Sequence, residues 1–124
     1  MKVLALDYGS ARTGVAVSDP TGTIARPLAT VTRVNDKTGF DELIAIVRDE
    51  QPELVVVGMP LTLRGEEGEQ ARETTAFVER LRAAVETRVD MWDERFTSVL
   101  ADGDDAKAAA HLLSSFLEWR STHS

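Results

Sequence analysis

The chain has 124 residues, 43% of them hydrophobic and 28% charged, which is typical of one folded domain spanning residues 1–124 with an ordinary core. No stretch approaches the roughly 20 apolar residues of a membrane span, and the apolar start is too short for a signal peptide, so we expect a cytoplasmic protein without membrane contact. The absence of cysteine excludes thiol catalysis, disulfides and thiolate zinc sites, and the net charge of −7 argues against casual nucleic-acid binding.

Three extended segments open the chain. Residues 2–6 and 13–18 are apolar runs of strand length, and a third segment at 24–32 is interrupted by Pro27. The links between these segments are short, whereas a parallel return needs a dozen residues or more. We therefore expect an antiparallel meander.

Helices and strands alternate in the rest of the chain. Apolar residues at helical spacing predict a helix through residues 40–47, and the uninterrupted apolar run at 53–59 predicts a strand in the centre of the sheet, covered on both faces. The remaining elements are a second helix with the stripe Ala71, Thr75, Val78, Leu81 and Val85, a strand at 89–92, and a final helix that begins near Asp104. This order predicts an α/β protein with the ribonuclease-H-like three-layer fold, a mixed five-stranded sheet with helices on both faces.

Three carboxylates lie where strands end or helices begin. Asp7 follows the first strand and precedes a glycine turn, Glu94 follows the last strand, and Asp105 lies at the start of the last helix. Ligands of open α/β sheets bind at strand ends, and carboxylates brought together there repel one another unless cations lie between them. Because hard cations take oxygen ligands, the pattern predicts an enzyme that depends on Mg²⁺ or Mn²⁺.

Each carboxylate also has a simpler interpretation. Asp7 could be a turn residue ahead of a glycine, and Glu94 could belong to a solvated run of charges in which at most one of Asp93 and Glu94 points inward. Asp105 could merely stabilise the helix dipole, as Asp104 beside it would. The helical phase separates these two, because Asp105 falls on the core-facing stripe, where an unpaired carboxylate is costly, whereas Asp104 faces elsewhere.

Four segments resemble, in the same order, the YqgF family of pre-16S rRNA nucleases, which are also described as Holliday-junction-resolvase-like: LDYGSARTGVAVSDP (residues 6–20), VGMPL (57–61), WDERFT (92–97) and DAKAA (105–109). The resemblance covers nearly the whole chain. It implies a cytoplasmic ribonuclease-H-like enzyme that matures the 5′ end of 16S rRNA, with Asp7, Glu94 and Asp105 as catalytic acids and metal ligands.

The mechanism that we expect is hydrolysis of a phosphodiester by two divalent ions, about 4 Å apart and bridged by Asp7. The residues expected to bind the substrate are Ser10, Arg12, Arg95 and Thr97. The expected partners are nucleic acid, as structured RNA or branched DNA, and ribosome-assembly factors, and the expected assembly is a monomer or a homodimer.

One segment departs from the family pattern. In the family a helix and a basic loop separate the third motif from the fourth, whereas here only residues 98–104 do, so either a basic arm has been lost or the chain omits a stretch. Loss of the arm would remove positive charge and weaken nucleic-acid binding. Three alternatives stay open. The first is resolution of branched DNA at the same site, and the second is a catalytically silent partner in ribosome assembly. The third is a phosphate-binding module like those of sugar kinases and actin-like ATPases, although those proteins need two domains to enclose a nucleotide.

Overall fold

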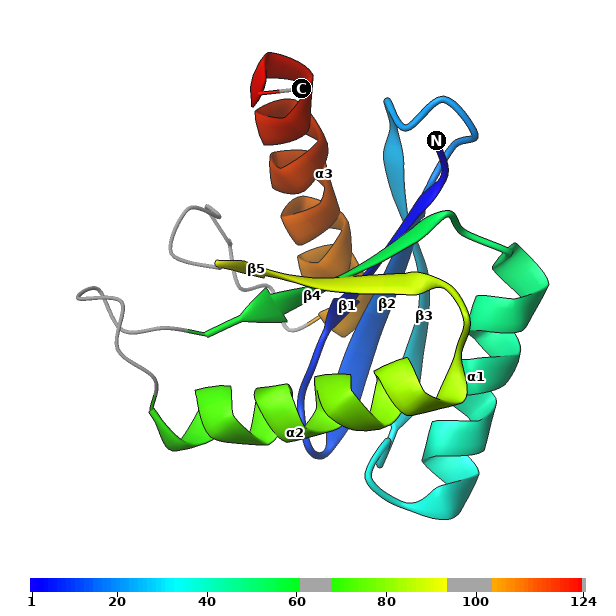
Figure 1. Ribbon diagram of the computed structural model, residues 1–124, viewed down its shortest axis with the longest axis vertical. Coiled ribbons are helices and arrows are strands. Elements are labelled where there is room, and N and C mark those ends of the chain that lie inside the picture. Colours follow the sequence, from blue (N-terminus) through cyan, green and yellow to red (C-terminus); the bar gives the residue numbers. More distant parts are fainter. Residues whose placement is uncertain (61–67, 94–103, 124) are drawn as a thin grey trace.

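The structure is a computed structural model that describes residues 1–60, 68–93 and 104–123 (Figure 1). Strands and helices follow the predicted order. They are β1 Val3–Asp7, β2 Arg12–Ser18, β3 Ala25–Thr32, α1 Lys37–Glu50, β4 Leu54–Met59, α2 Glu69–Ala84, β5 Arg88–Asp93 and α3 Asp105–His123. None of the helices in these ranges is long and apolar enough to cross a membrane.

The five strands form one mixed sheet in the order β3-β2-β1-β4-β5. β1, β2 and β3 are antiparallel neighbours, as their short links predicted, and β4 and β5 run parallel to β1. The interruption predicted at Pro27 is present as a register shift in the ladder between β2 and β3. Proline is tolerated there because β3 lies at the edge of the sheet.

The prediction that the 53–59 strand lies at the centre is wrong by one place. β4 is an interior strand, but β1 holds the middle position. The reason is the way in which the chain leaves β1: the meander adds β2 and β3 on one side, and the crossover through α1 returns the chain to the other side. An apolar run shows that a strand is covered on both faces, and both β1 and β4 meet that condition.

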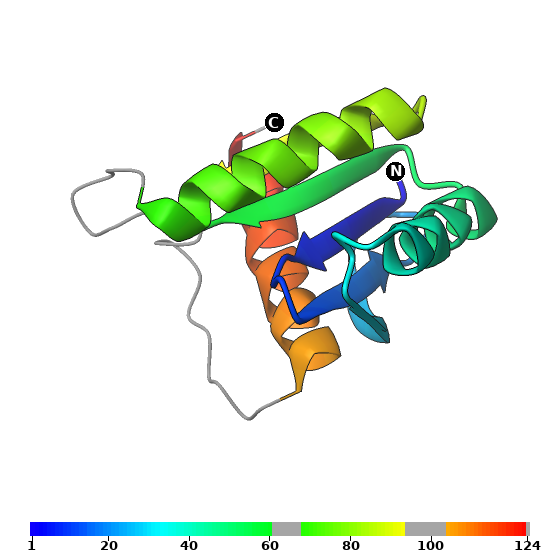
Figure 2. The same cartoon turned by 90° about the horizontal axis from the view of Figure 1, so that it is seen from below.

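The strand β1 is covered on both of its faces. Leu4 and Leu6 belong to the apolar cluster beneath α1 and α2, whereas Val3 and Ala5 belong to the cluster beneath α3. Figure 2 shows α2 lying along β4, and Figure 1 shows α3 apart from α1 and α2. Since side chains alternate along a strand, residue 7 is in phase with Val3 and Ala5, on the α3 face.

The buried face of α2 differs slightly from its prediction. The helix buries Thr74 and Phe77, whereas Thr75 is only partly covered, and Val85 ends the helix where the prediction had it extend the stripe. Thr74 is tolerated in the core because its hydroxyl donates a hydrogen bond of 2.8 Å to the carbonyl of Gln70. A hydroxyl that is satisfied within its own helix can pack like an apolar side chain.

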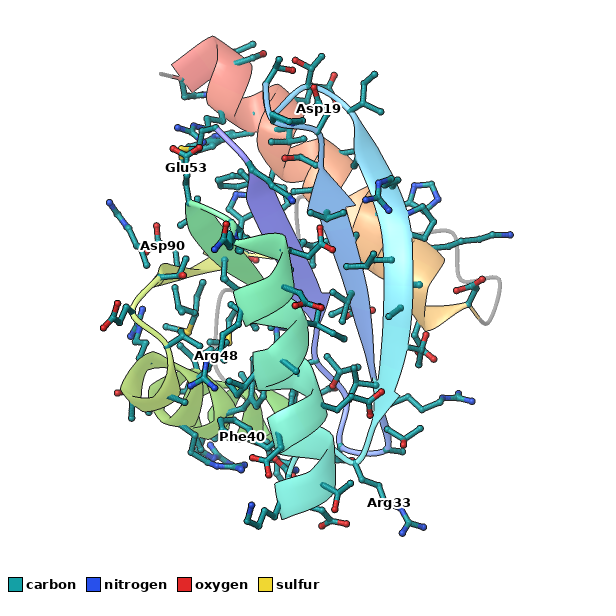
Figure 3. The ribbon with its side chains drawn as sticks, turned by 90° about the vertical axis from the view of Figure 1, so that its right-hand side faces the viewer. Asp19, Arg33, Phe40, Arg48, Glu53 and Asp90 are labelled. Atoms are coloured by element: carbon teal, nitrogen blue, oxygen red, sulfur yellow. The ribbon has the colours of Figure 1, made fainter. Side chains whose placement is uncertain are left out.

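One carboxylate, Asp19, organises the turn between β2 and β3 (Figure 3). Its Oδ1 accepts hydrogen bonds from the backbone N–H groups of Thr23 and Ile24, both at 2.8 Å, and its Oδ2 accepts from the backbone N–H and the hydroxyl of Thr21. These bonds, above all the one from Ile24, hold the pKa of Asp19 well below its ordinary value.

Replacing Asp19 with Asn should therefore destabilise the protein at neutral pH and matter less in acid. A carboxyl group whose pKa is lower in the folded than in the unfolded state stabilises the fold above the unfolded pKa of about 3.9, and this contribution is lost as the pH falls through the folded pKa. The melting temperature of Asp19→Asn should lie below that of the wild type at about pH 7 and approach it below about pH 3. An equal difference at both pH values would show that the charge of Asp19 is not responsible.

Candidate active site

Asp7 is the last residue of the middle strand and has a strand on each side. It pairs with Gly14 of β2, and the residue before it, Leu6, lies level with Val57 of β4. Both ladders therefore hold the backbone that carries this carboxylate. The position agrees with the prediction that Asp7 ends a buried strand, and the strand phase directs its side chain toward the α3 layer.

Asp105 reaches the same end of the sheet because Gly14 has no side chain. A Cβ atom built on Gly14 would lie 1.8 Å from the carbonyl oxygen of Asp105, so the first turn of α3 lies directly on the backbone of β2. Gly14 is also the strand partner of Asp7, and paired residues in antiparallel strands have Cα atoms about 4.5–5.5 Å apart. The structure thus brings Asp7 and Asp105 together, although they are far apart in the sequence.

The two adjacent aspartates at the start of α3 do different things. Asp104 caps the helix: its Oδ1 accepts hydrogen bonds from the backbone N–H groups of Ala106 (3.0 Å) and Lys107 (3.1 Å). Asp105 instead forms an ion pair, in which its Oδ2 lies 3.1 Å from the Nε of Arg12. Capping is thus supplied by Asp104, which leaves the Asp105 carboxylate for other partners, as the helical phase predicted.

Two of the residues predicted to bind substrate lie in the described part of the chain: Arg12, which contacts Asp105, and Ser10, which lies in the turn after Asp7. Arg12 begins β2, and 63% of its side chain is exposed although it pairs with Asp105. Ser10 is exposed in the turn between β1 and β2. It lines a pocket of about 450 Å³ whose other lining residues are Tyr8, Gly9, Glu69, Gln70 and Glu73.

The turn between β1 and β2 is held tightly by Gly9 and Thr13. The hydroxyl of the buried Thr13 donates to the Gly9 carbonyl at 3.1 Å and accepts from the Gly9 N–H at 3.4 Å. A Cβ atom on Gly9 would lie 2.4 Å from the carbonyl oxygen of Arg12, so the turn needs glycine there. The turn thereby fixes the spacing between Asp7 and Arg12, and no sequence pattern predicted that Thr13 takes part.

A second set of contacts that the sequence did not reveal supports the same turn from the α1 and α2 side. Asn35 donates to the Tyr8 hydroxyl at 2.9 Å, and Arg80 donates to the Asn35 side-chain oxygen at 3.1 Å. Tyr8 also stacks on Phe77 with the ring centroids 4.7 Å apart, and the Arg80 guanidinium lies 4.5 Å from the Phe40 ring centroid. Tyr8, directly after Asp7, is therefore locked in place by residues from two helices and a loop.

The other predicted site residues, Glu94, Arg95 and Thr97, lie outside the described residues. Their neighbour Asp93 ends β5 level with Met59, and Trp92 before it packs edge-on against Phe116 of α3, with centroids 5.9 Å apart. Because side chains alternate, Asp93 has the opposite phase and does not share the face of Asp7. Within the described ranges, no group of three His, Cys, Asp or Glu side chains is arranged to hold a metal ion.

The order and directions of the five strands, with one carboxylate at the end of the middle strand, define a ribonuclease-H-like α/β protein. The structure of T. thermophilus RuvC in complex with Holliday junction substrate matches with a TM-score of 0.62 and 16% sequence identity, over 98% of this chain and 96% of that chain. Archaeoglobus fulgidus Pelota matches with a TM-score of 0.51 and 15% identity, over 98% of this chain and 35% of its own. Such different proteins share the fold, so the fold alone does not decide the chemistry.

The chain belongs to the RuvX family, whose model, described as "RuvX: Holliday junction resolvase", matches residues 1–119. The "Putative pre-16S rRNA nuclease" of Sulfurihydrogenibium sp. (strain YO3AOP1) is 45% identical over 103 residues, which cover 82% of this chain and 70% of that protein. The protein of the same name from Rubrobacter xylanophilus is 44% identical over 131 residues, covering 94% of this chain and 92% of that protein. These matches confirm the family predicted from the four motifs.

The Rubrobacter alignment bears on the length of the chain. It spans 131 positions, whereas 94% of the 124 residues here is about 117, so about 14 aligned positions have no counterpart in this chain. The loss of a basic arm before Asp105 stays a prediction, since residues 94–103 lie outside the described ranges.

The substitution Gly14→Ala tests whether the close contact between Gly14 and the backbone of Asp105 positions Asp105. The new methyl group would collide with the backbone of Asp105, and overpacking of this kind typically costs about 1–3 kcal/mol. Urea denaturation should show that loss for Gly14→Ala. Gly68→Ala is the matched control, because no described residue lies within 4 Å of a Cβ atom built on Gly68, and it should change stability far less. Equal effects of the two substitutions would contradict the close seating of α3 on β2.

Proposed function

We propose that this chain is a metal-dependent nuclease that hydrolyses phosphodiester bonds at the end of the sheet where Asp7 and Asp105 meet, and that its substrate is the 5′ region of pre-16S rRNA. The observation that carries the proposal is the contact at Gly14, which joins two of the three predicted acids in one place. Relatives named as pre-16S rRNA nucleases share more than 40% of their aligned residues with this chain, which supports the choice of substrate.

The donors at this site fit hard divalent cations. Both are carboxylates of half-buried residues, one at the end of a strand and one at the start of a helix, and hard cations take such oxygen ligands. A cation already lies beside one of them, since the Arg12 guanidinium pairs with Asp105. We propose that Asp7, Asp105 and Glu94 would hold Mg²⁺ or Mn²⁺, which would supply an activated water and stabilise the leaving oxygen.

The residues of the chain position the substrate and the acids. The rigid turn at Gly9 and Thr13 keeps Asp7 at a fixed distance from Arg12, whose exposed guanidinium can donate to a phosphate. Ser10 at the same turn offers a hydroxyl to the substrate, and we propose that Arg95 and Thr97 extend this surface. The net charge of −7 limits general affinity for nucleic acid, so local arginines must supply the phosphate contacts.

A second candidate is resolution of branched DNA at the same site. It is favoured by the description of the family model and by the similarity of the fold to that of RuvC. The two activities would use the same acids and differ in the nucleic acid that the surrounding surface accepts. In either case we propose a monomer or homodimer, and a role in rRNA maturation implies the cytoplasm, where ribosome-assembly factors would be available as partners.

Asp7→Asn should abolish cleavage and leave the fold intact, because it removes a negative charge but keeps the shape of the side chain. We expect a loss of at least about a hundredfold in rate, the usual cost of removing one preorganised electrostatic group. The measurement is Mn²⁺-dependent cleavage of an RNA that carries the 16S 5′ leader and, in parallel, of a four-way DNA junction. Asp41→Asn is the control, since Asp41 pairs with Lys37 on the surface of α1.

The two substrates separate the candidates. Faster cleavage of the RNA supports the rRNA nuclease, and faster cleavage of the junction supports the resolvase. An Asp7→Asn protein that stays active, with unchanged dependence on Mn²⁺, would overturn the account of the site. A wild-type protein that binds the RNA but cleaves neither substrate would indicate an assembly role instead.

A further inference from the structure

We propose that Arg12 is a positioning residue that changes partner: it pairs with Asp105 while no divalent cation is bound there, and with a substrate phosphate once a cation has taken its place. Binding of the metal and binding of nucleic acid would then strengthen each other through one side chain. This inference rests on the proposed function. It adds the order in which the cation and the substrate phosphate engage the site, and it names Arg12 as the residue that couples the two binding events.

The first argument is the form of the ion pair. Arg12 contacts Asp105 through Nε at 3.1 Å, and 63% of the Arg12 side chain remains exposed, against 29% for Asp105. Pairs that are exposed to this extent contribute little to stability, because water screens them and holding a long side chain still costs entropy. The Arg12 side chain can therefore leave Asp105 without a large loss of stability.

The second argument is that Asp105 itself cannot follow Arg12. Its backbone lies against Gly14, and the turn that carries it is capped by Asp104 through the N–H groups of Ala106 and Lys107. Apolar side chains farther along α3 pack beneath the sheet and hold the helix in place. A change of partner at this carboxylate must therefore come from movement of the arginine.

The third argument is charge. Asp7 and Asp105 are two acids at one end of the sheet, and the arginine offsets part of their repulsion. A divalent cation bound by Asp105 would do the same with twice the charge, and it would compete with the guanidinium for the same carboxylate. The released guanidinium has a planar fork of N–H donors that matches the oxygens of a phosphate.

Such an exchange must be reciprocal. If a bound cation raises the affinity for RNA by freeing Arg12, then RNA that engages Arg12 raises the affinity for the cation by the same factor. Removing the Arg12 charge should therefore have two opposite effects. It should tighten binding of the metal alone and weaken the gain in RNA affinity that the metal brings.

The matched control for Arg12 is Arg33. It follows β3 directly, one residue after Thr32, the strand partner of Arg12, so it lies at the same end of the sheet. Figure 3 shows its side chain pointing away from the sheet into solvent. Arg33 has no carboxylate partner among the described residues. Replacing it removes one positive charge nearby without breaking the pair at Asp105.

The experiment begins with calorimetric titration of Mn²⁺ into the wild type, Arg12→Gln, Arg12→Lys and Arg33→Gln without RNA, after circular dichroism has shown that each is folded. We expect Arg12→Gln to bind Mn²⁺ about two- to fivefold more tightly, which is the range that an exposed ion pair can supply. Arg12→Lys should stay close to the wild type because it keeps the charge, and Arg33→Gln should change the affinity clearly less than Arg12→Gln.

The second measurement is fluorescence anisotropy of a labelled RNA hairpin, with and without saturating Mn²⁺, in short incubations after which the RNA is recovered intact. The gain in RNA affinity on adding Mn²⁺ should be about two- to fivefold smaller for Arg12→Gln than for the wild type or Arg33→Gln. The inference is overturned if Arg12→Gln and Arg33→Gln change the Mn²⁺ affinity alike, or if all three proteins show the same gain.

Asp7→Asn separates this inference from the proposed function. If Asp7→Asn loses Mn²⁺ binding while Arg12→Gln leaves both affinities unchanged, the metal site stands and the exchange of partners is wrong. If the wild type binds no Mn²⁺, or binds it equally well as Asp7→Asn, the metal site itself is wrong and the inference falls with it.

Discussion

The contact between the start of α3 and the backbone of β2 is the constraint on which the candidate site depends. The apolar layer between α3 and the sheet holds the helix against the sheet. The missing side chain at Gly14 determines how closely the helix approaches, because any Cβ atom there would meet the backbone of Asp105. Burial of apolar area is non-directional, so it cannot by itself place a carboxylate. The steric limit at Gly14 sets how closely α3 approaches β2, which burial of apolar area alone does not set.

Near this contact, residues that are adjacent in the sequence have different roles, one structural and the other in contact with a partner. The Asp104 carboxylate accepts hydrogen bonds from the backbone of α3, whereas the Asp105 carboxylate pairs with Arg12, which lies outside the helix. The same division holds across the first turn, where Thr13 is buried and bonded to Gly9 while Arg12 beside it is largely exposed. In the first turn the structural residue Thr13 is the buried one, whereas at the start of α3 the capping residue Asp104 is exposed and Asp105 is half-buried. A site built in this way can lose a ligating side chain without losing its fold.

The sequence predicted the parts of the site that depend on local pattern. A continuous apolar run of strand length placed Asp7 at the end of a strand, and the helical phase distinguished Asp105 from its neighbour. It could not predict that Arg12 pairs with Asp105, because the pairing depends on how α3 crosses the sheet. The role of Gly14 could not be predicted either, because it depends on the register of β2 in the sheet. The same holds for Arg80, which contacts the residues around Asp7 only through Asn35 and comes from a helix distant in the sequence. Because long-range pairing cannot be read from the sequence, β4 was predicted to hold the middle position in the sheet, which β1 holds.

The middle position of β1 has a consequence for how the site responds to local fluctuation. A strand with a hydrogen-bonded neighbour on each side and a helix layer on each face opens only when most of the domain opens, so its amides belong to the most slowly exchanging part of such a fold. Asp7 is anchored to that part. Asp105 instead lies in the first turn of α3, where the Asp104 cap and the contact with Gly14 hold the backbone. Helix ends open at a lower free-energy cost than central strands, so a local opening that broke this cap would remove Asp105 from the site while Asp7 stayed in place.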